Sequence, residues 1–201
     1  GGGTGVILAQ PEVAAIIATV QRHGITKMFA VPAVLNMILN HPDAVDADFS
    51  SMRVLPYGAS PIPLDVLSRS MQMFPNAQFV QMYGATETSG ASVYLPPEDH
   101  DPAGNGRMRA AGLPLPGVEI RVVDAEGHDV PPGTIREVIA KGRHGTNFTY
   151  QNSPEKRASM EKYGLLTPGD MGYFDNDGFL YLCDRINDMV ISGGANIYPA
   201  E

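Results

Sequence analysis

A tyrosine, a threonine and a glutamate lie close together in the stretch FVQMYGATETSG, residues 79 to 90. Tyr83 offers an aromatic face on which a nucleobase can stack, and Thr86 offers a hydroxyl group for a phosphate oxygen. Glu87 offers a hard oxygen ligand of the kind that Mg²⁺ takes together with phosphate groups. The same residues also fit a polar loop in which Thr86 and Glu87 cap a short helix, and spacing alone favours neither interpretation.

Small residues follow two of the predicted strands, and they leave room for a flat ligand to approach the backbone. These residues are Gly58, Ala59, Ser60, Gly84 and Ala85. In an open α/β sheet, ligands bind beyond the carboxyl ends of the strands, where the loops converge. The two loops, YGASP and YGATETSG, therefore predict one ligand site, and Met82 lies next to it.

The first half of the chain alternates between helical and extended patterns. Helices are predicted at 11–23, from about 33 to 40, and at 63–74, and strands at 25–31, 52–58 and 77–83. In the first helix Val13, Ile16, Ile17 and Val20 recur at helical spacing, and Gly24 is suited to its C-terminal end. This alternation predicts an α/β fold with a parallel-sheet layer.

The pattern becomes mostly β after residue 90. Segments 118–124, 136–142 and 172–185 read as strands, the last one folded into a hairpin at DNDG. We expect a small β-barrel-like or curved sheet here. The predicted organisation is an α/β subdomain at 1–90, a β-rich subdomain at 91–183, a hinge at 184–188 and the start of a mobile C-terminal domain at 189–201.

Composition restricts the class of protein. The 201 residues carry a formal net charge of −8, which argues against nucleic acid or an anionic membrane as the general partner. Cys183 is the single cysteine, so a disulfide framework is excluded and a reducing, cytoplasmic setting is expected. No apolar run is long enough to cross a bilayer. The five histidines share no metal-binding spacing and are expected at the surface.

Three motifs in order carry a family resemblance. YGATETSG resembles the YGxTE motif of the ANL superfamily, which comprises acyl-CoA synthetases, adenylation domains and luciferases. GLPLPGVEIRVVD and DMGYFDNDGFLYLCDRINDMVISGGANIYPAE resemble two later motifs of the same superfamily. The sequences of these motifs most resemble those of fatty-acyl-CoA ligases. The resemblance implies ATP, Mg²⁺ and CoA as reactants or cofactors, and a carboxylic acid, fatty or related, as substrate.

The resemblance also implies a role for each matching residue. Tyr83 would stack on adenine beside the Gly58–Ser60 loop, and Thr86 and Glu87 would be catalytic, contacting the α-phosphate and Mg²⁺. Further roles are implied as follows: Asp170 and Arg185 bind the ribose, Gly84 and Ala85 line the acyl end, and Gly193 and Gly194 border the pantetheine tunnel. The reaction implied is adenylation of the acid followed by transfer of the acyl group to a thiol.

Several positions depart from the family pattern. Pro168 and Gly169 replace a threonine before Asp170, so we expect one polar contact to be lost there. Ala195 replaces a glutamate, and Asn187 stands at the hinge position. The glycine-rich phosphate loop and the C-terminal lysine of the family do not occur in these 201 residues, which we therefore expect to be an internal fragment with little or no activity alone.

Two other functions stay open. One is an adenylation domain that loads a carrier protein instead of CoA. The other is a non-catalytic, adenylate-binding interaction module, against which the presence of Thr86, Glu87, Asp170 and Arg185 argues. The oligomeric state is not fixed by the sequence, and a homo-oligomer is compatible with it.

Overall fold

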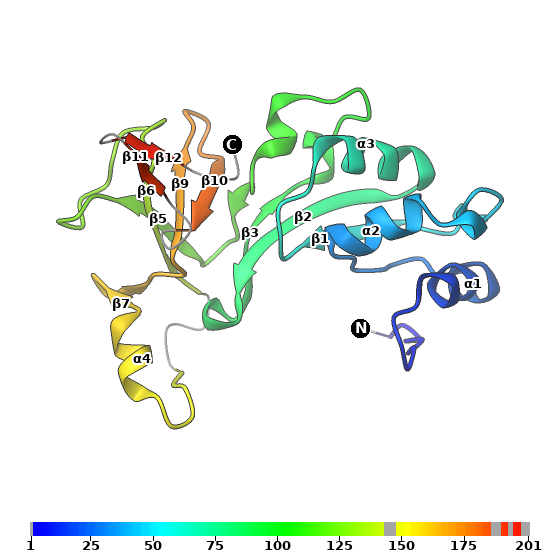
Figure 1. Cartoon of the computed structure of the whole chain (residues 1–201), viewed down its shortest axis with the longest axis horizontal. Coiled ribbons are helices and arrows are strands. Elements are labelled where there is room, and N and C mark those ends of the chain that lie inside the picture. Colours follow the sequence, from blue (N-terminus) through cyan, green and yellow to red (C-terminus); the bar gives the residue numbers. More distant parts are fainter. Residues whose placement is uncertain (1, 143–147, 186–189, 193–194, 198–201) are drawn as a thin grey trace. The chain divides into compact units, whose positions relative to one another are not determined.

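The computed structural model describes the backbone of residues 2–142, 148–185, 190–192 and 195–197, with side chains described no further than Cys183. The chain divides into two compact units, and each is considered by itself (Figure 1). The first unit comprises Gly1–Val80 and Pro97–Met108, and the second comprises Gln81–Pro96 and Arg109–Glu201. Strand β2 (Gln78–Ala85) runs through this division, so Tyr83 and Glu87 lie in the second unit.

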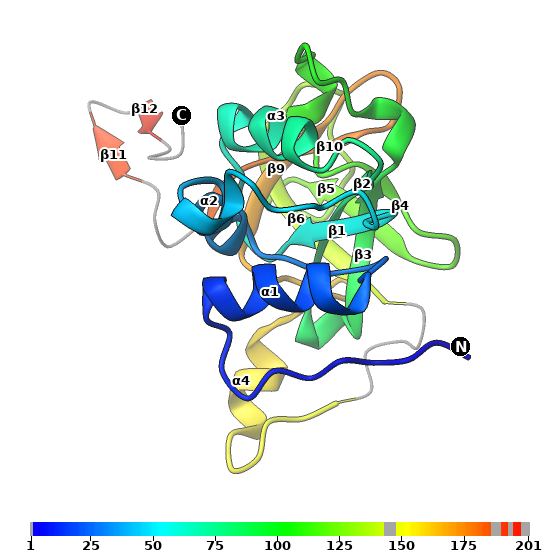
Figure 2. The ribbon, with the colours of Figure 1, turned by 90° about the vertical axis from the view of Figure 1, so that its right-hand side faces the viewer.

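Helices dominate the first unit, and Figure 2 shows three of them around strand β1. The elements here are α1 (Val13–His23), α2 (Pro32–Leu39), η1 (Pro42–Ala44), β1 (Val54–Gly58), α3 (Leu64–Met73), the start of β2, η3 (Pro97–Asp99) and the start of η4 (Gly106–Arg109). The three predicted helices are thus confirmed. Helix α1 ends at Gly24, whose φ of 55° lies in the left-handed region that glycine adopts at helix ends.

The segment at 25–31 differs from the buried strand that the sequence predicts. It contacts β1 through two isolated parallel bridges, Lys27 with Val54 and Ala30 with Tyr57. Phe29 is 55% exposed, whereas Ala30 is buried. The apolar run ITKMFAV therefore gives an extended segment that is buried only in part, with Thr26, Lys27 and Phe29 exposed. A run this short does not distinguish one buried face from two.

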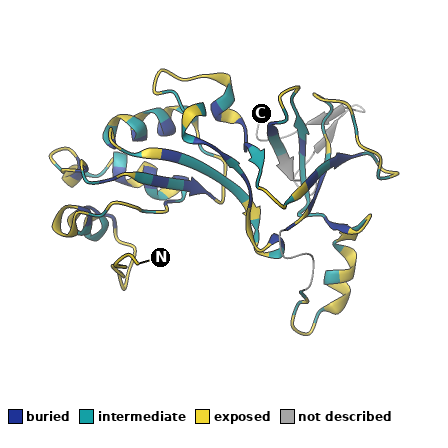
Figure 3. Ribbon diagram, turned by 180° about the vertical axis from the view of Figure 1, so that it is seen from behind, coloured by how far each residue is buried: buried dark blue, intermediate teal, exposed yellow. Residues whose placement is uncertain are grey.

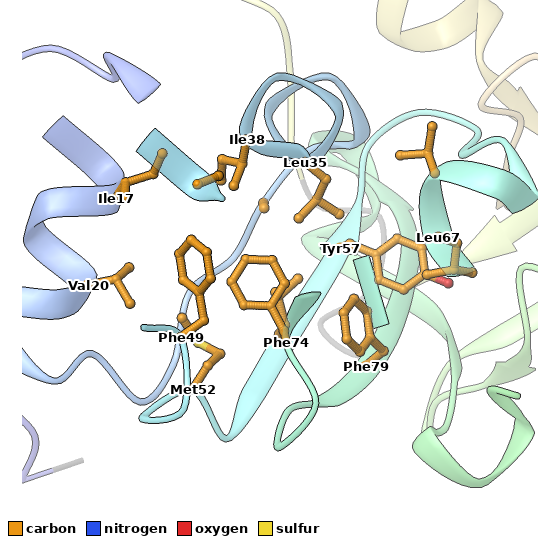
Figure 4. Close-up of a cluster of buried hydrophobic side chains, with 14 of the residues drawn as sticks. Ile17, Val20, Leu35, Ile38, Phe49, Met52, Tyr57, Leu67, Phe74 and Phe79 are labelled. Atoms are coloured by element: carbon orange, nitrogen blue, oxygen red, sulfur yellow. The ribbon is translucent and has the colours of Figure 1, made fainter. Parts of the chain in front are cut away.

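The core of the first unit is built from one apolar cluster (Figure 4). Each helix contributes its inward-facing residues, among them Ile17, Leu35 and Leu67, which are almost fully buried. Burying a side chain of this size stabilises the fold by about 1.5–3 kcal/mol. Phe49 and Phe74 meet in the middle of the cluster, with their ring centroids 4.6 Å apart.

Antiparallel strands dominate the second unit. They are the end of β2, β3 (Gly90–Leu95), β4 (Leu113–Pro114), β5 (Glu119–Val123), β6 (Arg136–Lys141), β7 (Glu161–Lys162), β8 (Leu165–Leu166), β9 (Asp170–Phe174), β10 (Leu180–Arg185), β11 (Val190–Ser192) and β12 (Ala195–Ile197), with η2 (Thr86–Thr88) and α4 (Pro154–Ser159) between strands. Strands β2, β3 and β4 are consecutive neighbours in one sheet. The strand order of the second sheet is β10-β9-β6-β8-β7, with β5 paired to β6.

Alternation along β5 follows the prediction. Ile120 and Val122 are buried in the second unit's core, while Glu119 is exposed. Figure 3 shows α4 as mostly exposed. Strand β3 was not predicted. It begins at Gly90, directly after Ser89, whose φ of 65° lies in the left-handed region.

The predicted DNDG hairpin is confirmed. The Asp175 side chain accepts hydrogen bonds from the backbone N–H groups of Asp177 and Phe179, both at 2.9 Å. Strand β10 continues to Arg185, two residues into the segment expected as a hinge, and 186–188 lies outside the described residues. No helix in the described part of the chain is long and apolar enough to cross a membrane.

Candidate active site

The turn that follows β2 is held by Thr88. Its hydroxyl oxygen accepts a hydrogen bond from the Ala85 N–H at 3.1 Å and lies 3.0 Å from the Ala85 carbonyl oxygen. Thr88 is 4% exposed, whereas Thr86 is exposed and makes no side-chain hydrogen bond to another described residue. The capping function that the sequence could have given to Thr86 therefore belongs to Thr88, and the Thr86 hydroxyl is accessible to a ligand.

Gly84 is required by the neighbouring strand. A Cβ atom at this position would clash with the Gly90 carbonyl oxygen and would lie 2.9 Å from the Ala91 Cα atom. The register between β2 and β3 shifts between Tyr83 and Gly84, as at a β-bulge. The close approach that the sequence predicts at Gly84 is thus made by the backbone of β3. Met82, half-buried on β2, pairs with Tyr94 of that strand.

Glu87 is held as a carboxylate by a partner from a distant part of the chain. The Tyr150 hydroxyl donates a hydrogen bond of 2.6 Å to Glu87 Oε1. This bond is the main cause of a lowered pKa of Glu87, and the positive charge of Lys156 acts in the same direction. The Lys156 Nζ atom lies 4.3 Å from the centre of the Tyr150 ring.

The environment of Glu87 suits a magnesium ion shared with a nucleotide. Mg²⁺ is bound by one or two carboxylates and takes its remaining ligands from phosphates and water. The described residues contain no group of three or more acidic, histidine or cysteine side chains that could hold a metal without such help. A single, partly exposed and ionised carboxylate at Glu87 fits this mode of binding.

Tyr83 and Asp170 are joined directly. The Tyr83 hydroxyl donates a hydrogen bond of 2.6 Å to Asp170 Oδ2, and both residues are half-buried. Asp170 begins β9, and its register partner on β10 is Arg185. The fold therefore brings together the backbone positions of three residues that the family resemblance assigns to the adenosine part of a nucleotide.

The Gly58–Ser60 loop belongs to the first unit, where it follows β1. Tyr57 and Gly58 are buried, and Ala59 and Ser60 are exposed. Ala59 has a φ of 70°, in the left-handed region that residues with a Cβ atom seldom occupy. Such conformations are retained where the surrounding structure or a function requires them.

Two residues whose side chains contact the predicted site or its neighbours were not identified from the sequence. His100, expected at the surface, is half-buried, and its Nε2 atom lies 2.9 Å from the Tyr57 hydroxyl oxygen. Burial raises the pKa of Tyr57. Tyr150 is the second residue, and only the aromatic and basic side chains of FTYQNSPEKR gave a hint of it. Gly193, Gly194 and Asn187 lie outside the described residues, and Ala195 is described only as the first residue of β12.

Comparison with known proteins places this geometry in a family. The family described as AMP-binding enzyme matches residues 1–148. The chain belongs to the AMP-binding enzyme family. Asp170 and Arg185 follow the matched segment, but curated relatives align across them as well.

Curated relatives of this AMP-binding enzyme act with different acids. A fatty acid–[acyl-carrier-protein] ligase of Streptomyces coeruleorubidus is 41% identical over 178 residues, covering 89% of this chain and 34% of the relative. A feruloyl-CoA synthase of Amycolatopsis is 34% identical over 200 residues, covering 100% of this chain and 39% of the relative. The chain thus spans between 34% and 39% of the length of these relatives.

Solved structures confirm the mixed α/β fold of this AMP-binding enzyme. The amide bond synthetase of Marinactinospora thermotolerans superposes with a TM-score of 0.81 at 31% identity, covering 93% of this chain and 37% of that one. The O-succinylbenzoate CoA synthetase of Bacillus subtilis, in complex with ATP and magnesium, gives a TM-score of 0.78 at 32% identity, covering 94% and 38%. The family and fold expected from the three motifs are therefore confirmed.

Proposed function

We propose that this chain forms the adenylate-binding part of an ATP-dependent ligase that joins a carboxylic acid to a thiol. The observation that carries the proposal is the hydrogen bond between Tyr83 and Asp170, with Arg185 opposite Asp170 in the sheet. An aromatic face, a carboxylate and a guanidinium group are suited, respectively, to a base, to ribose hydroxyls and to a ribose or phosphate oxygen.

In this proposal Tyr83 stacks on the adenine ring, and Gly58, Ala59 and Ser60 are proposed as further adenosine-binding residues. Asp170 accepts hydrogen bonds from the ribose hydroxyls, a contact in which an ionised acceptor makes the bond stronger than a neutral one. Arg185 donates to the ribose. Each assignment is a role for one side chain that site-directed substitution can test.

The phosphate end of the nucleotide falls to Thr86 and Glu87. The exposed Thr86 hydroxyl donates to an α-phosphate oxygen, because Thr88 already makes the structural bonds of the turn. Glu87 supplies a carboxylate oxygen to Mg²⁺, which, when bound, neutralises charge on the phosphates. Tyr150 and Lys156 keep Glu87 ionised and oriented.

The proposed reaction has two balanced steps. In the first, a carboxylate oxygen of the acid attacks the α-phosphorus, the bond to the β-phosphate breaks, and pyrophosphate leaves. In the second, a thiolate sulfur attacks the acyl carbonyl carbon, and AMP leaves with the electron pair of the acyl–oxygen bond. In these two steps the described residues form no covalent bond with a reactant. Their proposed contribution is to position the reactants and to stabilise charge.

The identities of the acid and of the thiol are more specific proposals. A fatty or related acid is proposed, in line with the fatty-acid ligases among the relatives, which also include feruloyl and indoleacetate ligases. CoA is the proposed thiol, since most of the relatives considered are CoA ligases. Gly193 and Gly194 are proposed to border the path of its pantetheine arm, and Gly84 and Ala85 the acyl end.

A carrier protein is a second candidate acceptor. The specific observation in its favour is the 41% identity to a fatty acid–[acyl-carrier-protein] ligase. An acceptor exchange distinguishes the two candidates: adenylate formed with a suitable acid is presented with CoA or with a phosphopantetheinylated carrier protein. Acyl transfer to one acceptor and not to the other identifies the thiol.

The proposal is tested with a panel of carboxylic acids in the longest natural protein that contains this chain. We expect release of AMP that requires an acid, ATP and Mg²⁺, with straight-chain fatty acids among the active compounds. Nucleotide binding without AMP release for any acid would instead indicate a non-catalytic adenylate-binding module. Activity with aromatic acids alone would correct the choice of a fatty substrate and leave the adenylation chemistry in place.

A further inference from the structure

We infer that Glu137, Thr167 and Lys162 form a clamp that positions Asp170 for the ribose of the nucleotide. The inference rests on the proposed ribose contact of Asp170 and assigns a function to three residues that do not themselves touch the ligand. They are positioning residues, and together they are called the Glu137 clamp.

The clamp is centred on one carboxylate that takes three donor contacts. Lys162 Nζ lies 2.8 Å and 2.7 Å from the two carboxylate oxygens of Glu137. The Thr167 hydroxyl donates to Glu137 Oε1 at 2.6 Å. The Glu137 side chain is 17% exposed, so these contacts lie largely out of solvent.

The contacts reach Asp170 through the short loop between β8 and β9. The Thr167 hydroxyl group donates its proton to Glu137, and its oxygen accepts a hydrogen bond from the Gly169 N–H at 3.1 Å. Gly169 has a φ of 84°, in the left-handed region, and it directly precedes Asp170. Pro168 fixes its own φ, so few torsions remain free between Thr167 and the start of β9.

Backbone pairing also brings Glu137 close to Asp170, from the other side along the chain. In the ladder between β6 and β9, Glu137 is the register partner of Met171, the residue that follows Asp170. The side chain of Glu137 thus holds the loop before Asp170, while its backbone lies against the strand after it. Asp170 is fixed from both directions along the chain, by one residue.

The clamp also accounts for a departure from the family motif. Pro168 and Gly169 stand where the family has a threonine, and loss of one polar contact is expected from the sequence. In this chain a threonine hydroxyl is present one position earlier, at Thr167, and it bonds both to Glu137 and to the loop backbone.

A structural ion pair is the alternative to a positioning role. Isolated ion pairs near the surface contribute little to stability, and a purely structural contact would affect every ligand of the unit alike. A positioning role has a different signature, since it affects only ligands that carry the hydroxyl groups Asp170 accepts. Comparison of AMP with 2′,3′-dideoxy-AMP separates the two, because the second nucleotide lacks both hydroxyls.

The experiment measures dissociation constants for both nucleotides in the longest natural protein that contains this chain. Wild type should prefer AMP by about tenfold or more, the effect of a charge-assisted hydrogen bond. Thr167→Val should weaken AMP binding and leave dideoxy-AMP unchanged, so that the preference falls to about threefold or less. Thr167→Ser keeps the hydroxyl and should restore the preference.

Two further variants keep the test independent of any one substitution. Glu137→Gln removes the charge that Lys162 and Thr167 share, and it should lower the preference for AMP in the same way. Asp129→Asn is the matched control, since it breaks the 2.7 Å ion pair with Arg121 in the same unit without touching the loop before Asp170. Circular dichroism establishes that each variant folds.

The possible outcomes separate the clamp from the proposed function. Equal weakening of both nucleotides, or no change in Thr167→Val and Glu137→Gln, overturns the positioning role while leaving the ribose contact intact. A wild-type protein that binds both nucleotides equally overturns the ribose contact, and the clamp's role with it. Selective loss of AMP binding that Thr167→Ser restores supports the clamp.

Discussion

The Tyr83 hydroxyl donates a hydrogen bond of 2.6 Å to Asp170 Oδ2, although 87 positions separate the two residues in the sequence. Tyr83 lies in β2, two residues before that strand ends at Ala85, and Asp170 begins β9 of the second sheet. The bond links the residue proposed to stack on adenine with the residue proposed to bind ribose. The bond therefore holds these two side chains together without a ligand.

Tyr83→Phe separates the two functions of this tyrosine. The ring remains for stacking and the hydroxyl is lost, so we expect AMP affinity to fall by about threefold to tenfold, the effect of one modest hydrogen bond. Tyr83→Ala should cost more, because base–aromatic stacking is lost as well. Titration with AMP measures both. Tyr163→Phe, which removes a hydroxyl bonded to the Ala125 carbonyl, is the control and should bind AMP normally.

Thr86 and Thr88 should respond in opposite ways to the same substitution. Thr88→Val removes the acceptor of the Ala85 N–H in a buried turn, and it should lower the free energy of unfolding by about 1–2 kcal/mol. Thr86→Val should change stability by less than about 0.5 kcal/mol and yet impair adenylation. Urea denaturation and AMP release are measured for both variants. A destabilised Thr86→Val with normal activity would return Thr86 to a structural role.

Tyr150→Phe tests the ionisation of Glu87. The hydrogen bond lowers the pKa of Glu87, so its stabilising effect is present above the ordinary carboxyl pKa and is lost as the pH falls through the lowered value. The difference in unfolding free energy between wild type and Tyr150→Phe should therefore be largest near about pH 7 and shrink below about pH 4. The same variant should need more Mg²⁺ for half-maximal activity. A pH-independent difference would show that the bond does not depend on the charge of Glu87.

Gly84→Ala tests the close approach of β2 and β3. The added methyl group would meet the Gly90 carbonyl oxygen, so we expect the free energy of unfolding to fall by about 1–3 kcal/mol. Gly106→Ala is the control, because nothing lies within 4 Å of a Cβ atom there. Thermal unfolding of the two variants gives the comparison. Equal stability of both would contradict the tight packing at Gly84.

The sequence predicts the helices and most strands because their signals are local. Gly24 ends a helix and DNDG turns a hairpin wherever they occur in such a context, and both do so here. The segment at 25–31 and strand β3 were harder to predict, since short apolar runs do not reveal how many faces are buried. The three ordered motifs identified the family without any knowledge of contacts.

The features of the site that the sequence did not predict depend on contacts between residues far apart in the chain. Nothing in the spacing of YGATETSG distinguishes Thr86 from Thr88 as the cap, because the choice depends on which hydroxyl turns inward. Tyr150 reaches Glu87 across 63 positions, and Glu137 reaches Thr167 across 30, and no periodicity reports such pairs. These contacts follow from tertiary packing alone.

The most direct test of the central claim is a titration of AMP into wild type and Asp170→Ala, in the longest natural protein that contains this chain. Asp177→Ala, an exposed position in the hairpin after β9, is the control. We predict that Asp170→Ala weakens AMP binding by roughly tenfold to a hundredfold, as loss of charge-assisted hydrogen bonds requires, while Asp177→Ala binds as wild type. AMP binding that is equally tight in Asp170→Ala and in wild type would contradict the assignment of this site to the adenylate.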